Sequence, residues 1–242
     1  SSNTAAGDGA LFSNIDGNNN TATGDGALNK NTTGSSNTAT GDGALYDNTT
    51  GSSNTAAGDG ALFSNIDGNF NTASGINALF SNISGNNNTA SGRGALQQNT
   101  TGNYNTASGI QALYKNIDGN SNTASGMNAL FSNTTGDYNT AIGYFADVVS
   151  GALTNATAIG YGAEVSASNK IRLGNTNILV IEGQVAFSNA SDRRLKKDIT
   201  NTRYGLQTIL ELVPVDYQLK SNDLSQVGFI AQDLKPIVPE AV

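Results

Sequence analysis

Short apolar clusters alternate with polar runs of Asn, Thr, Ser and Gly along the first two thirds of the chain, and the alternation has a fixed period. The tripeptide Asn-Thr-Ala begins every 17 residues, at 3, 20, 37, 54, 71, 88, 105, 122 and 139. An Ala-Leu pair recurs with the same period, first at Ala10-Leu11. A fixed period of this length predicts a repeat protein in which each repeat forms one small structural unit that stacks on its neighbours.

The residue types within one repeat predict strands and tight turns, because Gly and Asn are too frequent for a pair of helices. We expect one strand centred on Asn-Thr-Ala-x-Gly and a second over the Ala-Leu-aromatic segment, as at Ala61-Leu62-Phe63. The recurring Gly residues, such as Gly7 and Gly17, are expected to supply positive φ at turns. The recurring Asn residues, such as Asn14, are expected to tolerate the left-handed region and to stack in ladders of side-chain hydrogen bonds.

These elements predict a mainly β fold, in which residues 1–168 form a parallel β-solenoid or β-roll with a thin core of Ala and Leu. Ten coils at a strand spacing of ~4.8 Å would make a rod of roughly 50 Å. Leu and an aromatic residue are neighbours in six repeats, at 11–12, 45–46, 62–63, 79–80, 113–114 and 130–131. This stripe predicts lateral association of chains, which we expect to be three; the alternative is that the stripe belongs to the core of one chain.

The composition favours a regular repeat over disorder and limits the possible chemistry. Apolar residues make up 37% and charged residues 13% of the 242 residues, whereas disordered chains usually combine low hydrophobicity with many charges. Because the chain contains no Cys and no His, thiolate catalysis, imidazole catalysis and zinc sites built from those ligands are excluded. We predict no cofactor and no bound metal.

Charge is distributed unevenly along the chain. Residues 1–184 carry 5 basic and 12 acidic side chains, and residues 185–242 carry 7 of each. An acidic repeat region is a poor binder of nucleic acid or of an anionic membrane surface. No apolar run approaches the ~20 residues of a transmembrane helix. We therefore predict neither a nucleic-acid partner nor membrane insertion.

The 17-residue period breaks after Gly160, and alternating β-branched residues with a turn at Gly174-Asn175 predict a β neck over 169–187. From residue 188 onward charged residues become frequent, and a third segment is predicted over 188–242.

The third segment reads as a small α+β domain. Apolar residues at 206, 209, 210 and 213 predict a helix over 204–212, which Pro214 ends. Strands are expected over 215–219 and 227–231, followed by a short helical turn before Pro236.

Two stretches of this segment resemble the endosialidase-type intramolecular chaperone domain, which ends many phage tail spikes and tail fibres and occurs in a few membrane-bound transcription factors. They are Ser191-Asp192-Arg193-Arg194-Leu195-Lys196-Lys197-Asp198-Ile199 and Val227-Gly228-Phe229-Ile230-Ala231-Gln232-Asp233-Leu234, the second followed by Val238-Pro239-Glu240-Ala241-Val242. The resemblance implies a domain that trimerises, templates folding of the β-fibre before it and then cuts itself off. It also implies further residues after Val242, so that the domain is incomplete in this chain.

The same resemblance implies that Ser191 and Lys196 are catalytic and that the bond between Ser191 and Asp192 is cut. A Ser hydroxyl needs a base, and Lys serves as one only when desolvation or neighbouring positive charge keeps it neutral. Neighbouring charge is available from Arg193, Arg194 and Lys197, and burial at a subunit interface would couple cleavage to assembly. The alternative is that Ser191 or Asp192 is an ordinary helix N-cap.

The repeats also resemble the heads of trimeric autotransporter adhesins, which are left-handed parallel β-rolls whose usual period is shorter than 17. The closest matches are Ala141-Ile142-Gly143-Tyr144-Phe145-Ala146 and Ala158-Ile159-Gly160-Tyr161-Gly162-Ala163. Together the resemblances predict a homotrimeric structural protein of a phage tail fibre or spike, or of a related injection particle. It would attach to an unidentified host receptor or glycan and be located in the virion tail fibre or at a cell surface. The alternative is a bacterial trimeric surface adhesin.

Three other functions have weaker support: catalysis on an external substrate, ice binding and calcium binding. Self-cleavage is the one enzymatic activity that the sequence suggests, and no external substrate is predicted. Ice binding would need paired Thr on one face, but most repeats replace the second Thr by Ala or Ser. Calcium binding is suggested by Gly-Asp-Gly at 7–9, 24–26, 41–43 and 58–60, but later repeats replace this Asp by Ile, Arg or Met.

Overall fold

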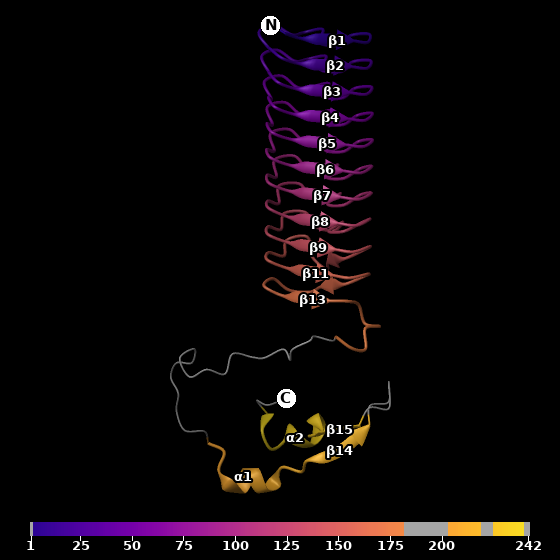
Figure 1. Cartoon of the computed structure of the whole chain (residues 1–242). Coiled ribbons are helices and arrows are strands. Elements are labelled where there is room, and N and C mark those ends of the chain that lie inside the picture. Colours follow the sequence, from indigo (N-terminus) through magenta and orange to yellow (C-terminus); the bar gives the residue numbers. More distant parts are fainter. Residues whose placement is uncertain (1, 182–202, 219–224, 240–242) are drawn as a thin grey trace. The chain divides into compact units, whose positions relative to one another are not determined.

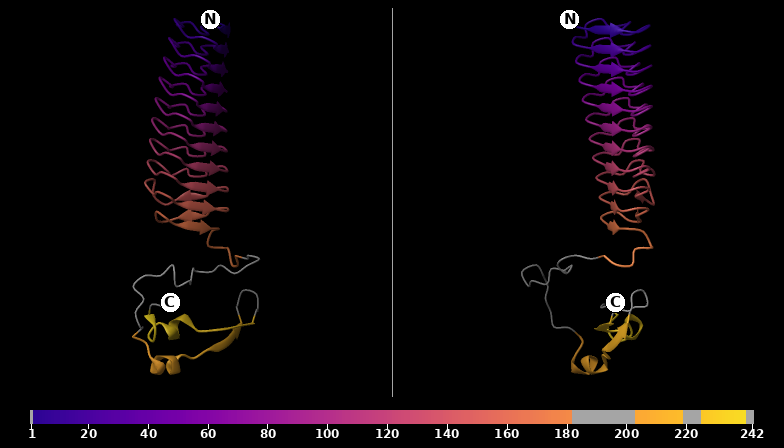
Figure 2. Two further views of the ribbon diagram at one scale, coloured as in Figure 1. Left: turned by 60° about the vertical axis from the view of Figure 1, so that its left-hand side comes forward. Right: turned by 45° about the vertical axis from the view of Figure 1, so that its right-hand side comes forward.

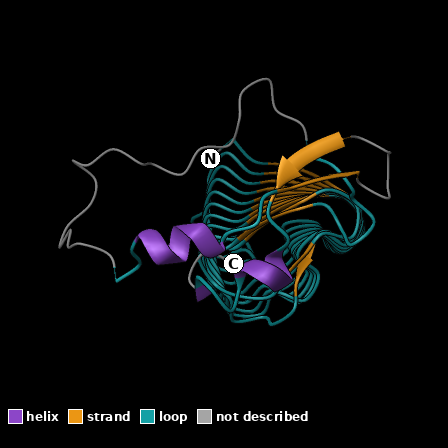
Figure 3. Ribbon diagram, turned by 90° about the horizontal axis from the view of Figure 1, so that it is seen from below, coloured by secondary structure: helices purple, strands orange, loops and turns teal. Residues whose placement is uncertain are grey.

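The computed structural model describes residues 2–181, 203–218 and 225–239, and the chain divides into two compact units, Ser1–Asn177 and Ile178–Val242. The first unit is a regular stack of coils, which Figures 1 and 2 show from the side. Seen along the stack in Figure 3, successive coils lie over one another and their strands gather on one side.

Each coil contributes one three-residue strand to an 11-stranded parallel sheet that runs the length of the first unit. Paired residues are 17 apart from β1 through β11, as for Thr4 and Thr21, so the sequence period is the length of one coil. This confirms the predicted parallel β-solenoid of 17-residue turns. The strands in sheet order are β1 (Thr4–Ala6), β2 (Thr21–Thr23), β3 (Thr38–Thr40), β4 (Thr55–Ala57), β5 (Thr72–Ser74), β6 (Thr89–Ser91), β7 (Thr106–Ser108), β8 (Thr123–Ser125), β9 (Thr140–Ile142), β11 (Thr157–Ile159) and β13 (Ile171–Leu173).

The second strand predicted for each repeat is wrong for the first eight coils, where the Ala-Leu-aromatic segment is a turn. Leu62 has φ 53°, and the other Leu residues of this column have φ between 50° and 54°. The backbone N–H of Phe63 donates to the Gly60 carbonyl at 3.3 Å, and that of Asn65 donates to the Leu62 carbonyl at 3.2 Å. The left-handed conformation turns the chain while the Leu side chain stays inside, where it is fully buried.

A second strand does form in the two coils that replace this Leu by an acidic residue. β10 (Asp147–Val148) and β12 (Glu164–Val165) pair in parallel. Burial raises the pKa of the Asp147 carboxyl above its ordinary value, although N–H groups of Val148 and Ser132 donate to it and oppose the rise. A carboxylate cannot take the place of Leu in the apolar interior, and the chain follows a different path there.

The core consists of columns of Ala and Leu, as predicted. Ala22, Ala27 and Leu28 and their equivalents are 0–1% exposed in the second to eighth coils. The predicted Leu-aromatic stripe therefore does not exist as one surface. Its Leu half is the core of a single chain, whereas its aromatic half faces outward and is half-buried in stacks such as Tyr46, Phe63 and Phe80.

Two columns of buried Asn form the predicted ladders of side-chain hydrogen bonds. In the first column each Nδ2 donates to the Oδ1 of the Asn one coil earlier at 2.7–2.8 Å and to a Gly carbonyl three residues later at 2.9–3.0 Å. Its members are Asn14, Asn31, Asn48, Asn65, Asn82, Asn99, Asn116 and Asn133.

In the second column each Oδ1 accepts the backbone N–H one coil later at 2.8–2.9 Å, and each Nδ2 donates to a carbonyl 14 residues later at 2.6–2.8 Å. This column runs from Asn3 to Asn139. No Asn of either column has positive φ, so the expectation that these Asn residues adopt the left-handed region is wrong. Positive φ occurs instead at Gly, at the core Leu, at the corner residue before the second Asn, and at Asn77, Gln111, Asn128 and Phe145, which take the place of Gly9 in their coils.

The Gly residues that follow the first column are required by space and not by conformation. Gly68 does not have positive φ, but a Cβ there would lie 2.4 Å from Asn65 Oδ1 and 2.5 Å from the Gly85 carbonyl oxygen. Gly7 and its equivalents do have positive φ, as predicted. Space alone excludes a Cβ at Gly68, whereas at Gly58 of the Gly7 column positive φ and space both exclude it, because a Cβ there would lie 2.6 Å from the Gly75 carbonyl oxygen.

The last coil is shorter than the others. Thr157 of β11 pairs with Ile171 of β13, which is 14 residues away. Ile171–Leu173, at the start of the predicted neck, is therefore the last strand of the solenoid sheet, and the solenoid extends beyond residue 168. Residues 182–187 of the predicted neck lie outside the described residues. The shortened coil contains Ala158–Ala163, one of the two adhesin-like motifs.

The Asn ladder predicts a large loss of stability from one substitution. Asn65→Ala removes the donor to Asn48 Oδ1 and the acceptor of Asn82 Nδ2, which are both buried. We expect the free energy of unfolding to fall by about 3 kcal/mol. Chemical unfolding followed by circular dichroism measures it. Gln98→Ala, which removes an exposed amide, is the control, and an equal effect of both variants would contradict the role of the ladder.

Two Gly positions predict opposite outcomes for substitution: Gly68, where space excludes a Cβ, and Gly94, which has positive φ and lies in the column of Gly9. Gly68→Ala should destabilise by about 3 kcal/mol or more, because backbone and a buried amide leave no room for Cβ. Gly94→Asn should change stability by less than about 0.5 kcal/mol, because Asn77 and Asn128 already occupy the equivalent place with φ 55–56°. The same unfolding measurement compares them, and a loss at Gly68 no larger than that at Gly94 would contradict the exclusion of a Cβ by lack of space.

Candidate functional site

The residues that the sequence predicts to be catalytic, Ser191 and Lys196, lie outside the described residues. The same holds for Asp192 at the predicted cut and for the basic neighbours Arg193, Arg194 and Lys197. Their roles stay predictions, and the candidate site lies in described residues of the second unit, 203–218 and 225–239.

Two helices and a hairpin make up this part. α1 (Leu206–Glu211) lies within the predicted helix and ends before Pro214, and α2 (Ala231–Leu234) is the predicted helical turn before Pro236. β14 (Val215–Gln218) lies where a strand was predicted and pairs antiparallel with β15 (Ser225–Gly228). β15 begins two residues before the predicted strand and ends three residues early, because the chain turns into α2 at Ala231.

The apolar side of α1 has no partner among the described residues of one chain. Leu206, Ile209, Leu210 and Val213 recur at helical spacing and are 63–72% exposed. Neither α1 nor α2 contains a buried residue. Exposing such a row to water is unfavourable by roughly 25 cal/mol for each Å² of apolar surface. This face is therefore suited to contact another protein surface.

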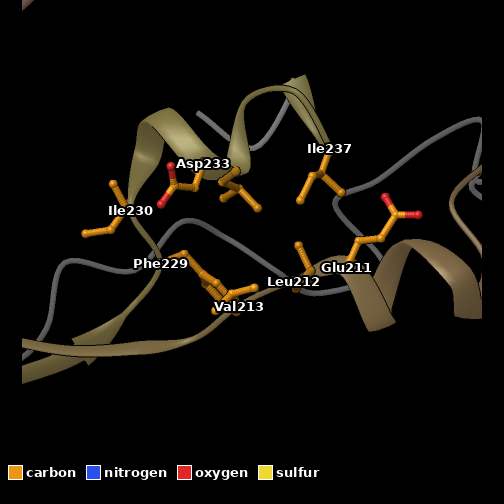
Figure 4. A pocket seen from close by; sticks show the side chains of 8 residues that line it. Glu211, Leu212, Val213, Phe229, Ile230, Asp233 and Ile237 are labelled. Atoms are coloured by element: carbon orange, nitrogen blue, oxygen red, sulfur yellow. The ribbon is translucent and has the colours of Figure 1, made fainter.

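A cavity of about 190 Å³ lies between the end of α1 and the segment from β15 through α2 (Figure 4). Its lining is apolar apart from the carboxylates of Glu211 and Asp233, and it contains no Ser or Lys that could act as nucleophile or base. The lining residues are Glu211, Leu212, Val213, Phe229, Ile230, Asp233, Leu234 and Ile237. The described lining can thus bind an apolar group, and none of its residues could serve as the nucleophile or base of acyl transfer.

Half of this lining comes from the second sequence motif. Phe229 and Ile230 link β15 to α2, and Asp233 and Leu234 belong to α2. The sequence analysis identified this motif but did not predict that it lines a cavity. It also did not predict Ile237, which lines the cavity but lies outside the motif. The motif therefore builds a local apolar surface.

Two kinds of site are absent from the described residues. None of the helices in the described ranges is both long and apolar enough to cross a membrane. Nor do three His, Cys, Asp or Glu side chains gather there in a way that would hold a metal ion.

Comparison with known proteins assigns this second unit. The family described as "Chaperone of endosialidase" matches residues 191–242, which include both sequence motifs and begin at Ser191. Curated proteins gave no significant match. Domains of this family are typical of phage tail fibres and spikes and act in trimeric fibres. Residues 191–242 are thus an endosialidase-type chaperone domain, and they follow a β-solenoid repeat region.

Proposed function

We propose that the chain is a structural protein of a phage tail fibre or spike, or of a related injection particle, and that it serves attachment to a host surface. The observation that carries the proposal is the order of its parts: a regular β-solenoid followed by a chaperone domain of a family that acts in trimeric fibres. In this proposal the solenoid through β13 is the shaft, the residues after it up to 187 are a neck, and 188–242 are the chaperone.

The exposed apolar surface of the second unit supports a homotrimer. The side of α1 with Leu206, Ile209 and Leu210 would be covered by the same domain of two further copies. Oligomerisation buries such surface without requiring a larger core in each chain. A second and third copy of this chain are therefore the proposed partners of this face.

The regularity of the shaft explains why its folding would need a chaperone. The second to eighth coils bury the same Ala, Leu and Asn columns, so a chain can stack on its neighbours in several registers with nearly equal internal energy. Repeat arrays can also nucleate at many places. A trimeric domain after the last coil would align three chains from one end, and correct register would spread from there.

Self-cleavage after folding completes the proposal. Ser191 would supply the nucleophilic hydroxyl and Lys196 the base for hydrolysis of the bond between Ser191 and Asp192, which consumes one water and leaves a carboxylate on Ser191 and a free amine on Asp192. Released from the chaperone, the mature fibre would end at Ser191.

A bacterial trimeric adhesin is the second candidate, and one observation favours it. The last coil has 14 residues, a period shorter than 17, and it contains the adhesin-like motif over 158–163. The chaperone domain favours the tail-fibre proposal, because it is typical of phage tail fibres and spikes.

Intact mass spectrometry of the full-length protein tests cleavage. We expect a fragment that begins at Asp192, and we expect Ser191→Ala and Lys196→Arg to abolish it, because Arg stays protonated and cannot act as a base. Ser188→Ala and Lys197→Arg are the matched controls and should cleave normally. A single uncut mass in every sample, or normal cleavage of Ser191→Ala, would contradict self-cleavage and leave a retained structural domain.

Light scattering coupled to size exclusion tests the trimer. Leu210→Lys places a charge on the exposed apolar side of α1 and should shift the protein from trimer to smaller species. Gln207→Lys places the same charge beside that row on the same helix and should leave the trimer intact. A monomeric wild-type protein would contradict the proposed function, and a trimeric Leu210→Lys variant would exclude this face as the contact.

A further inference from the structure

A row of exposed aromatic side chains follows one corner of the solenoid. Phe70, Tyr104 and Tyr138 occupy the same place in their coils, directly before a buried Asn, and they occur in every second coil. Their side chains are 63–65% exposed. The coils between and before them have Ser or Asn at this place: Asn19, Ser36, Ser53, Asn87 and Ser121.

The corner is an unfavourable place for a bulky residue. Phe70, Tyr104 and Tyr138 have φ of 58–59°, a left-handed conformation that Asn tolerates much better than aromatic residues. None of the three rings stacks on another ring in the described part of the chain, so ring packing does not offset the strain. Strained residues that contribute little to packing are typical of functional surfaces.

The spacing along the stack distinguishes these three aromatic residues from those that stack on one another. Tyr46 and Phe63 lie in consecutive coils and stack with ring centroids 5.1 Å apart, so each covers a face of the other. Phe70, Tyr104 and Tyr138 are separated by two coils, or ~9.6 Å, and a small polar residue lies between them. Among the described residues no other aromatic ring therefore covers these three side chains, and most of their surface is exposed.

The chemistry of the row identifies a class of ligand. A flat exposed ring fits the C–H face of a sugar ring, and the two-coil spacing is comparable to the length of a disaccharide unit in an extended polymer. Between the rings lie Asn87 and Ser121, whose side chains make no hydrogen bond in the described structure and can bond sugar hydroxyls. The acidic excess of residues 1–184 disfavours a polyanion.

We propose that the row of Phe70, Tyr104 and Tyr138 binds an extended neutral polysaccharide along the shaft, one disaccharide unit to each pair of coils. The inference rests on the proposed attachment function and gives it a location and a ligand class. A surface made of repeated weak contacts gains affinity with polymer length, because each ring adds to the same chain.

Affinity electrophoresis of the full-length protein tests the proposal. Native gels contain hydroxyethylcellulose, glucomannan, β-1,4-galactan or pullulan, with alginate as the polyanion. The variant Phe70→Ser/Tyr104→Ser/Tyr138→Ser introduces the residue that other coils use. The matched control is Ile66→Thr/Ile83→Thr/Ile117→Thr, since these side chains are also exposed (42–44%) and other coils have Thr there.

We expect at least one neutral polymer to retard the wild-type protein and alginate not to do so. The aromatic variant should bind that polymer about tenfold more weakly or worse, while the control stays within about twofold. The proposal is overturned if no neutral polymer retards the wild type or if the aromatic variant binds equally well.

Light scattering on the same samples separates this inference from the proposed function. A trimeric wild type that binds no neutral polymer overturns the inference alone, whereas a monomeric wild type overturns the proposed function. Loss of the trimer in the aromatic variant would show that the row is a contact between copies, which also overturns the inference.

Discussion

The buried Asn amide is the group on which the solenoid depends. A coil has one three-residue strand and a core of Ala and Leu, so backbone pairing and apolar burial per coil are small. Each Asn of the first column, such as Asn65, bonds the coil before it, the coil after it and the turn of its own coil. A buried amide is costly unless it is satisfied, and a slip of one residue would leave every amide of the column without partners. The ladder thus sets the coil length at 17.

The regular interior leaves the surface free to vary. Inward positions repeat the same residues. The exposed position after the strand, in contrast, is Asp in the first four coils (Asp8 through Asp59) and Tyr in the last two (Tyr144 and Tyr161). The two classes of aromatic residue follow from the same division. Stacked rings on consecutive coils add stability to the shaft, and isolated rings on alternate coils add a surface with little packing of their own. A shaft built in this way displays side chains at a fixed interval, which suits recognition of a polymer.

Periodicity was sufficient to predict the parallel sheet, the Ala and Leu core and the Asn ladders, because each depends on identical residues stacking on themselves. It failed at Leu62, since positive φ at a Leu contradicts local preference and is imposed by the turn around the core. Periodicity also did not predict the reason for Gly at position 68. A Cβ there is excluded by Asn65 Oδ1, which belongs to the Asn ladder, and the geometry of that ladder cannot be derived from local sequence preferences. For the candidate site, the motif over 227–234 predicted the family, whereas the cavity it lines depends on tertiary contact with the end of α1.

Identical coils also explain why a separate chaperone domain, and its removal, are physically reasonable. Because the coils are nearly identical, several alignments of the stacked coils have nearly equal energy. A segment that does not repeat is therefore needed to select one alignment. The shortened last coil between β11 and β13 and the domain over 191–242 are the parts at the C-terminal side that depart from the repeat. In the proposed fibre, unfolding would have to break the Asn ladder coil by coil, so the fibre would persist through a slow unfolding rate after removal of the domain proposed to align it. Cleavage would then make assembly irreversible, because the separated fibre lacks the template needed to refold in register.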